Sequence, residues 1–216
     1  QQLGAFPIDV GRTPIDILVT GGHKWLNAPF GAGFMYIRPA VRDRLRPSVA
    51  GYLSVDPPPG GWAEYFRTPS ITPLQPVAFT SGARRYETGG TGNYPGAAGL
   101  AASLDLINGL GPAAIADHIV GLTGLLIEGL SSLPVRVVTP RAAACRSGIV
   151  TFGLGSVAQE AALIERLLDA RVMVSHRYTS GVGGVRVSCH FFNAEEDVAR
   201  LLEVTGAWLS ASAPAR

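Results

Sequence analysis

The hydrophobic pattern at the start of the chain predicts two strands joined by a glycine-rich loop. Residues 16–20 form a short apolar run rich in β-branched side chains, and glycines 21 and 22 end it. A second apolar run, 34–37, follows the loop. Continuous apolar runs of this length are typical of strands that lie buried inside a sheet. We therefore expect two buried strands, with the loop held at the edge of their sheet.

The middle of the chain has a different pattern. A helix-like run covers residues 40–45, and proline and glycine are dense after it, above all at 56–61. An irregular stretch of this length in a compact fold is usually functional or faces a partner. Two helices follow in the prediction, 95–110 and 112–133, with glycine between them.

Beyond these helices the pattern alternates between strands and helices, which predicts a small α/β domain. The expected order is strand 135–139, strand 148–154, helix 158–170, strand 172–176, strand 184–191 and helix 194–209. Asn193 and Glu196 have the spacing of an N-cap and capping box at the last helix. We place a domain boundary near Gly111, which divides the chain into residues 1–110 and 111–216.

Composition and charge narrow the class of protein. Hydrophobic residues make up 47% and charged residues 16%, which is low for a free-standing surface. A net charge of +2 gives no basis for a nucleic-acid or membrane-surface partner, and no run of about 18 apolar residues is evident. Cys145 and Cys189 fit a reducing compartment and form no metal-type cluster. We expect a soluble, cytoplasmic protein with no nucleic-acid and no membrane partner.

One residue stands out chemically, because Lys24 is the only lysine beside seventeen arginines. A guanidinium stays protonated, whereas a lysine amine can lose its proton and condense with a carbonyl. A position on a glycine-rich loop between two buried strands would disfavour the charged form of this amine. Lys24 is therefore the first candidate for covalent catalysis, with a plain surface charge as the alternative.

Motifs in one particular order extend over nearly the whole chain. Residues 16–38 hold an Asp, a strand, His-Lys and a glycine turn into a second strand, and residues 1–9 read Gln-x-x-Gly-x-x-Pro-x-Asp, starting at Gln1. Residues 85–95 read Arg-Tyr-Glu-Thr-Gly-Gly-Thr-Gly-Asn-Tyr-Pro. Near the end, 185–188 read Val-Arg-Val-Ser and 193–197 read Asn-Ala-Glu-Glu-Asp. Together they resemble the class V aminotransferase family, the fold-type-I pyridoxal-phosphate enzymes that include cysteine desulfurases, isopenicillin-N-epimerase-like proteins and kynureninases.

The resemblance implies an α/β fold in two parts. Residues 1–110 would be the C-terminal part of the large domain that binds pyridoxal 5'-phosphate (PLP), and 111–216 a small C-terminal α/β domain. Family members are considerably longer. The glycine-rich phosphate cradle, the group that stacks on the ring and the Asp that pairs with the pyridine nitrogen would all precede Gln1. The resemblance therefore implies that the N-terminal half of such an enzyme lies outside this chain.

The resemblance also implies roles for residues around the lysine. Lys24 would form a Schiff base with PLP and then move the Cα proton of the substrate as general base and acid. His23 would help to hold the phosphate or lie against the site. Gln1 would hydrogen-bond the phenolic oxygen of the ring. Because Gly21 stands where the family usually has Ser, Thr20 is the candidate to replace that phosphate contact.

Two further segments carry implied roles. Thr91, with Gly90 beside it, offers a hydroxyl and open backbone amides to a phosphate. In the family this loop reaches the site of the other subunit, which implies a homodimer with a shared active site. An extra glycine at 89–90 leaves two registers open. Arg186 would bind the α-carboxylate of an amino acid substrate in bidentate fashion.

The reaction type stays open. Desulfurases place a mobile loop with a nucleophilic cysteine where this chain has 176–184, and that segment contains none. Cys189 lies in a predicted strand and is expected to be a small buried thiol. Cysteine desulfuration is thus disfavoured, which leaves an aminotransferase, epimerase or lyase. The alternatives are an inactive fragment or subunit that needs the missing half, and a non-enzymatic interaction domain that uses 56–61.

Overall fold

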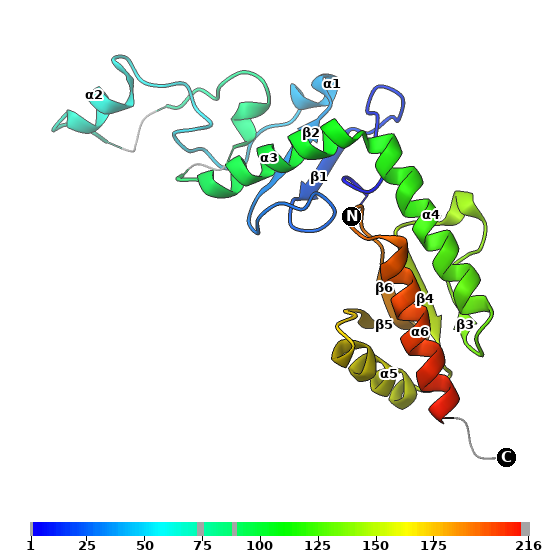
Figure 1. The fold of residues 1–216 in the computed structure, drawn as a ribbon. Coiled ribbons are helices and arrows are strands. Elements are labelled where there is room, and N and C mark those ends of the chain that lie inside the picture. Colours follow the sequence, from blue (N-terminus) through cyan, green and yellow to red (C-terminus); the bar gives the residue numbers. More distant parts are fainter. Residues whose placement is uncertain (1, 73–75, 88–89, 213–216) are drawn as a thin grey trace. The chain divides into compact units, whose positions relative to one another are not determined.

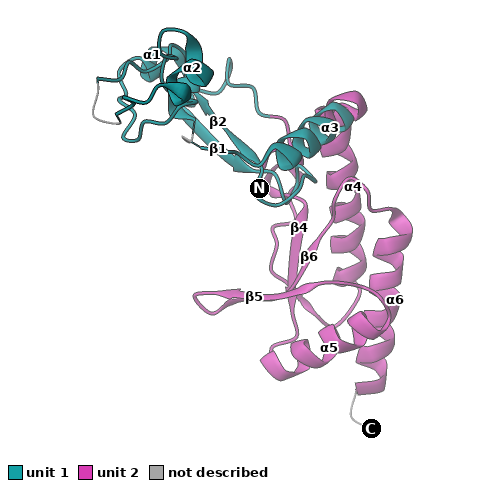
Figure 2. Ribbon diagram, turned by 90° about the vertical axis from the view of Figure 1, so that its left-hand side faces the viewer, with its two compact units in different colours: residues 1, 8–106 teal, residues 2–7, 107–216 magenta. Residues whose placement is uncertain are grey.

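The computed structural model describes three stretches of the chain, residues 2–72, 76–87 and 90–212. These residues form two compact units, shown in separate colours in Figure 2. The first unit contains residues 8–106, and the second contains 2–7 together with the chain from 107 onward. The division falls inside one helix, α3, close to the glycine at which the sequence pattern suggested a boundary.

The first unit contains a single hairpin-like sheet and several short helices. Strands β1 and β2 pair antiparallel from Ile17↔Ile37 to Gly21↔Gly33. The elements of this unit are β1 (Ile17–Gly21), β2 (Gly33–Ile37), α1 (Pro39–Arg42), α2 (Gly61–Arg67), the 3₁₀ helix η1 (Ala83–Tyr86) and α3 (Tyr94–Leu110). Both strands and α3 were predicted within one or two residues.

The prediction that these two strands are buried is wrong for the described chain. Val19 in β1 is 71% exposed and Met35 in β2 is 43% exposed, whereas Ile37 is buried. A strand is buried on both faces only where other layers cover them. Within the described residues, this sheet has two strands and its faces remain largely open.

The second unit is a four-stranded antiparallel sheet with helices packed on one face. Its elements are α4 (Pro112–Ser131), β3 (Arg136–Val137), the 3₁₀ helix η2 (Ala143–Cys145), β4 (Ile149–Gly153), α5 (Val157–Asp169), β5 (Ser175–Thr179), β6 (Val182–Ser188) and α6 (Glu195–Ser212). The strand order is β3-β4-β6-β5. Helices α4 and α6 lie side by side over the sheet, and α5 packs beside α6 (Figure 1).

The core of this unit follows from the alternation of side chains along the central strands. Val150 and Phe152 of β4, with Val185 of β6, are fully buried and point to the same face of the sheet. They pack against leucines from all three helices, such as Leu126 and Leu163. The residues between them, including Arg186, therefore point to the opposite face.

The segment before β6 is a strand, β5, which forms a hairpin with β6. The sequence pattern had instead predicted a strand at 172–176 followed by a loop. Strand β5 begins at Ser175 and continues to Thr179, and it pairs with β6 through a two-residue turn. The turn residues, Ser180 and Gly181, have φ of 49° and 75°. Positive φ at both positions is the type I′ geometry that suits the twist of a two-residue hairpin. The Ser-Gly pair is a weaker signal for this turn than Asn-Gly, so the sequence pattern missed it.

The expected capping pair of α6 is also wrong. Asp197, and not Glu196, receives the hydrogen bonds at the helix start, from Ala194 N at 3.1 Å and from Asn193 Nδ2 at 3.0 Å. The Asn193 side chain and then the Ala194 amide lower the pKa of Asp197 below its ordinary value. Asn193 Oδ1 instead accepts from the backbone N–H of His190, at 2.8 Å.

Helix α4 is long and apolar on average, although Asp117, His118 and Glu128 interrupt its apolar residues. In the described part of the chain it is the one helix long and apolar enough to cross a membrane by length and composition, with a mean hydropathy of 1.5. Of its apolar 18-residue window, 44% is buried; Ile119, Leu122 and Leu126 are among the buried residues of the helix, and the two leucines belong to the core. This burial pattern is that of a core helix in a globular domain.

Candidate functional site

The candidate lysine lies on the loop between β1 and β2. The loop is closed by backbone hydrogen bonds from Gly22 N to Ala32 O at 2.7 Å and from Ala28 N to Gly22 O at 2.9 Å. Trp25 and Leu26, which follow the lysine, are buried. The apolar residues of the loop thus anchor it to the unit, and Lys24 remains on the outside.

A glycine at position 22 is needed for this loop to close. A Cβ there would lie 2.9 Å from Ala28 Cβ and 3.1 Å from Ala32 O, closer than side chains normally approach. On the inner side, the carbonyl of Leu26 accepts a hydrogen bond from Ser103 Oγ of α3. The loop is therefore held by hydrogen bonds within itself and by one hydrogen bond from helix α3, which is distant in sequence.

Lys24 itself is exposed, and so is His23 beside it. The expectation of a dry, apolar surrounding for this amine is wrong for the residues described, because the faces of β1 and β2 are open. An exposed amine on an anchored loop is accessible to an aldehyde. The arrangement thus keeps Lys24 as a candidate nucleophile without the burial that the sequence suggested.

The ring of His23 stacks on that of Phe30, with centroids 4.9 Å apart and planes at 19°. Gly21 gives this ring its room, since a Cβ at that position would lie 3.3 Å from both His23 Nδ1 and Cε1. The glycine that replaces the family's Ser thus has a local steric reason. Thr20, the candidate to replace the lost hydroxyl, is half-buried, and its Oγ1 lies 3.3 Å from the carbonyl oxygen of Gly21.

Asn93 joins the lysine loop to the segment that contains Thr91. Its Nδ2 donates to the carbonyl of Phe30 at 3.1 Å, and its Oδ1 accepts from Gly96 N at 2.9 Å. The second bond is that of an N-cap at the start of α3. The sequence prediction gave Asn93 no role, although an Asn directly before a helix is a recognisable signal.

Thr91 and Gly90 therefore lie on a segment tied to the lysine loop. Thr91 is exposed, and a Cβ placed on Gly90 or Gly92 would meet nothing within 4 Å, so no neighbouring atoms crowd the segment on that side. A cavity of about 610 Å³ lies between this segment, β2 and α3, and residues such as Gly31 and Asn93 line it. Gln1 and residues 88–89, on which the question of register depends, lie outside the described residues.

Replacing Asn93 with alanine is expected to lower the free energy of unfolding of this unit by about 1 kcal/mol, because α3 loses its cap and the Phe30 carbonyl loses its partner. Urea unfolding of the protein measures this. Asn108→Ala, at an exposed position of the same helix, is the matched control and should change stability little. Equal effects of the two substitutions would contradict the role assigned to Asn93.

Arg186 lies in β6 of the second unit, opposite Thr151 of β4 and Ser175 of β5. The residue is half-buried, and its Nε is buried without a hydrogen-bond partner among the residues described. A buried N–H that lacks an acceptor costs about 1–3 kcal/mol, and more when the group is charged. An unpaired guanidinium N–H of this kind suits an acceptor such as a carboxylate.

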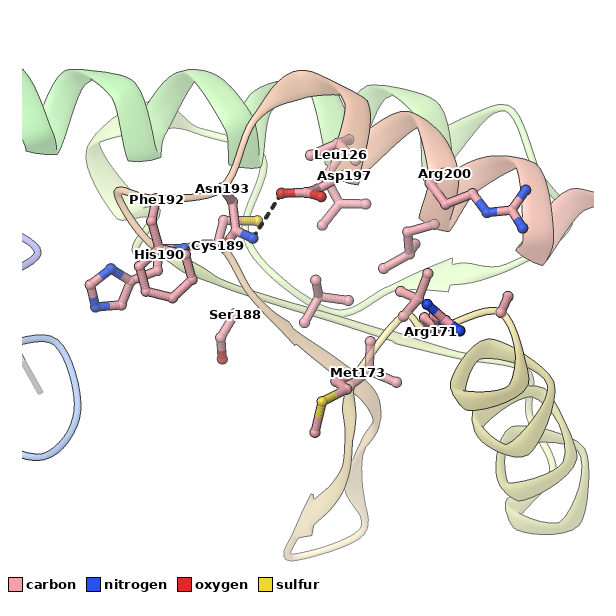
Figure 3. A pocket seen from close by; sticks show the side chains of 16 residues that line it. Leu126, Arg171, Met173, Ser188, Cys189, His190, Phe192, Asn193, Asp197 and Arg200 are labelled. Atoms are coloured by element: carbon pink, nitrogen blue, oxygen red, sulfur yellow. Dashed lines mark hydrogen bonds between the residues drawn. The ribbon is translucent and has the colours of Figure 1, made fainter. Parts of the chain in front are cut away.

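A cavity of the second unit does not involve the expected site residues. It has a volume of about 560 Å³ and lies between the start of α6, the end of β6 and the segment before β5 (Figure 3). Cys189 lies in its wall, with the Asn193–Asp197 hydrogen bond beside it. Burial, and then the charge of Asp197, raises the pKa of Cys189 to about 11. This confirms the expectation of a buried thiol.

The two cysteines should therefore react very differently with a thiol reagent at pH 8. Exposed Cys145 should be modified at once, while Cys189, with about one thiolate in a thousand at that pH, should react slowly until the protein unfolds. Relative to its ordinary value of 9.0, the raised pKa means that the stability from the neutral thiol is complete below pH 9 and is lost as the pH rises towards 11.

Ellman's reagent added to wild type and to Cys145→Ser measures both rates. The variant should show only the slow phase. A fast phase that survives in the folded variant would mean that Cys189 is accessible.

Comparison with known proteins gives consistent matches. The sequence signature of the family Aminotransferase class-V matches residues 1–201. Isopenicillin N epimerase of Streptomyces clavuligerus is 29% identical over 207 residues, which cover 94% of this chain and 50% of the epimerase. The apo cysteine desulfurase of Thermococcus onnurineus NA1 is similar with a TM-score of 0.80 and 27% identity, covering 98% of this chain and 51% of that one. A mutant of C-DES with glycine covalently linked to its PLP cofactor gives 0.78 and 27%, covering 94% and 49%.

The chain belongs to the class-V aminotransferase family, a family of PLP-dependent enzymes. The resemblance drawn from the motifs is thereby confirmed, as is the α/β fold related to PLP enzymes of fold type I. The chain spans about half the length of the relatives it matches. It therefore corresponds to part of their fold.

Proposed function

We propose that this chain provides the lysine and the carboxylate-binding arginine of a PLP-dependent enzyme that acts on an amino acid. The observation that carries the proposal is the first unit's arrangement: an exposed Lys24 on an anchored loop, with the Gly90–Thr91 segment tied to that loop through Asn93. The family membership supports the identity of the cofactor.

The residues present fit such a cofactor. PLP supplies an aldehyde that condenses with amines and a ring that withdraws electrons from the Cα of the substrate. Lys24 would hold the cofactor through its amine and move a proton at Cα. The imidazole of His23, fixed against Phe30, would lie beside it. Thr20 would donate a hydrogen bond to the phosphate and Gln1 to the ring oxygen, while Thr91 and the backbone amide of Gly90 would donate to the phosphate held by the other protomer of the dimer.

Arg186 would orient the substrate. Its buried Nε has no acceptor among the described residues, so a substrate carboxylate would satisfy it and form the paired N–H···O bonds of an arginine fork. A fixed carboxylate determines which bond at Cα stands perpendicular to the cofactor ring and therefore which bond breaks. Arg186 is thus proposed to control the reaction through orientation.

The reaction class we propose is that of an aminotransferase, epimerase or lyase. Several relatives are cysteine desulfurases by name, and one is an isopenicillin N epimerase. In this chain, residues 175–188 form a tight hairpin whose strands and two-residue turn contain no cysteine, and Cys189 is a buried thiol. A hairpin of this kind carries no sulfur nucleophile, so cysteine desulfuration is disfavoured.

Partners and location complete the proposal. We propose a homodimer that shares its active sites through the Gly90–Thr91 segment, in the cytoplasm. The alternative is a chain that is silent without the remainder of the enzyme. A third possibility, an interaction module, is favoured by the aromatic group that follows residues 56–61, in which Trp62 stacks with exposed Phe66 at 5.9 Å and meets Tyr65 at 5.6 Å. Partner binding that survives replacement of both Lys24 and Arg186 would support that module.

The test of the main proposal is covalent. The protein is incubated with PLP, treated with borohydride and digested, and the modified peptide is identified by mass spectrometry. Because Lys24 is the only lysine, attachment at an ε-amine can occur at one position only. Modification of the Lys24 peptide supports the proposal, and a colourless protein that remains unmodified contradicts it.

A further inference from the structure

A buried carboxylate lies outside the site described above. Glu160 of α5 is 1% exposed, and it is the one buried charged residue in the described part of the chain. A buried charge is costly unless hydrogen bonds satisfy it. Glu160 is well satisfied: Leu154 N donates to Oε1 at 2.9 Å, His176 Nε2 lies 3.0 Å from Oε2, and Tyr178 OH donates to the same oxygen.

These three partners come from two different parts of the sheet. Leu154 follows the end of β4, whereas His176 and Tyr178 are two residues apart on one face of β5. Gly153 makes room for the carboxylate, since a Cβ there would lie 3.2 Å from Glu160 Oε1. One side chain of α5 thus connects a helix, the end of a central strand and the outer strand.

The charge of Glu160 is maintained by this arrangement. Burial raises the pKa of Glu160, but hydrogen bonds from Tyr178, His176 and Leu154 lower it by more. The net effect is a pKa below the ordinary value, so the carboxyl is ionised near neutral pH. The same contact raises the pKa of Tyr178. Glu160 therefore holds β5 through charge-assisted hydrogen bonds, which are stronger than neutral ones.

The position of β5 matters because β5 is an edge strand. In the described sheet its neighbour is β6 alone, and their pairing runs from Thr179↔Val182 to Ser175↔Arg186. The last pair places Ser175 directly opposite Arg186. A shift of register in a hairpin would turn each side chain to the other face of the sheet.

We propose that Glu160 is a positioning residue that holds the β5–β6 hairpin in register and thereby fixes the guanidinium of Arg186. This inference rests on the proposed role of Arg186 as the ligand of the substrate carboxylate. Glu160 does not touch the substrate. It acts through His176 and Tyr178, which join it to the strand paired with Arg186.

Glu160→Gln tests the first half of this proposal. The amide has the same shape, but its NH₂ cannot accept the bonds from His176 and Tyr178. Backbone amide hydrogen exchange in β5 should rise about tenfold or more, with the exchange of buried α4 amides unchanged. Glu165→Gln, at an exposed position of the same helix, is the matched control and should change neither. If amide exchange in β5 were unchanged in Glu160→Gln, the proposal that Glu160 holds β5 in place would be wrong.

The second half is tested with two probes that differ only in the carboxylate, glycine and glycinamide. Their binding to the PLP-loaded protein is followed by the visible absorbance of the cofactor. Glu160→Gln should weaken the binding of glycine about tenfold and the binding of glycinamide little. In a protein that already carries Arg186→Ala, it should not weaken glycine binding further. Tyr178→Phe removes one hydrogen bond at a side chain that is 42% exposed, and it should give a smaller change in the same direction.

The outcomes separate the two proposals. If Arg186→Ala weakens glycine but Glu160→Gln does not, although β5 has loosened, Glu160 is only a fold-stabilising residue and the inference is wrong. If Arg186→Ala itself leaves glycine binding unchanged with Glu160 intact, the proposed role of Arg186 is wrong instead. An equal loss for glycine and glycinamide would likewise indicate a merely structural role for Glu160.

Discussion

Lys24→Ala should lose the covalent attachment of PLP at this loop, because the ε-amine is gone. Activity should fall by about 10²–10⁴-fold or more, because the side chain proposed to move the proton at Cα is missing. Lys24→Arg is the matched variant. It keeps the positive charge at an exposed site but has no amine that can condense with an aldehyde. Both variants are compared with wild type by visible absorbance and by intact mass after borohydride treatment.

The fold should be unaffected by either change. Lys24 is exposed, while the loop is anchored by buried Trp25 and Leu26 and by the Gly22–Ala32 hydrogen bond. Thermal unfolding of the three proteins should therefore agree closely, because exposed substitutions of this kind change stability by less than about 0.5 kcal/mol. Visible absorbance of bound PLP and activity that both stay at the wild-type level in Lys24→Ala would overturn the assignment of the lysine.

Arg186→Ala should weaken glycine binding to the PLP-loaded protein by about 10- to 100-fold, since a hydrogen bond to a charged group is worth about 1.5–3 kcal/mol. Glycinamide, which lacks the carboxylate, should bind almost as before. The wild-type preference for glycine over glycinamide should therefore disappear. The ratio of the two dissociation constants measures the effect directly and is insensitive to the amount of active protein.

Stability gives a second readout for Arg186. Because its Nε is buried without an acceptor among the described residues, removal of the guanidinium should leave the free energy of unfolding unchanged or slightly higher. Arg177→Ala, at an exposed position on the neighbouring strand, is the control for loss of charge. A large loss of stability in Arg186→Ala, with the glycine preference intact, would assign this arginine to the fold and not to the substrate.

Most elements of the second unit were predictable because their signals are local. The apolar stripe of α4 and the alternation along β4 and β6 repeat within a few residues, and each repeat reports which face is buried. Hairpin β5–β6 was missed because its Ser-Gly turn is a weak signal, and the start of β5 was misplaced with it. The cap of α6 was assigned to the wrong acid because Glu196 and Asp197 are adjacent and both are acidic.

The burial of β1 and β2 was the larger error. An apolar run indicates that a strand can be covered, but it does not identify the residues that cover it. In the described chain, Val19 and Met35 are exposed, and with them the lysine loop. The chain spans about half the length of its relatives. Within the described residues, β1 and β2 form a two-stranded sheet, and no further layer covers their apolar side chains.

The sequence by itself identified the candidate groups of this protein: a single lysine in a motif of known order, and an arginine on an alternating strand. Only the tertiary structure decided how these groups are held. Asn93 contacts the lysine loop 63 residues away, the His23 ring uses the space left by Gly21, and Glu160 joins α5 to the strand beside Arg186. The physical reason is that residue type sets what a side chain can do, whereas contacts between distant segments set where it lies.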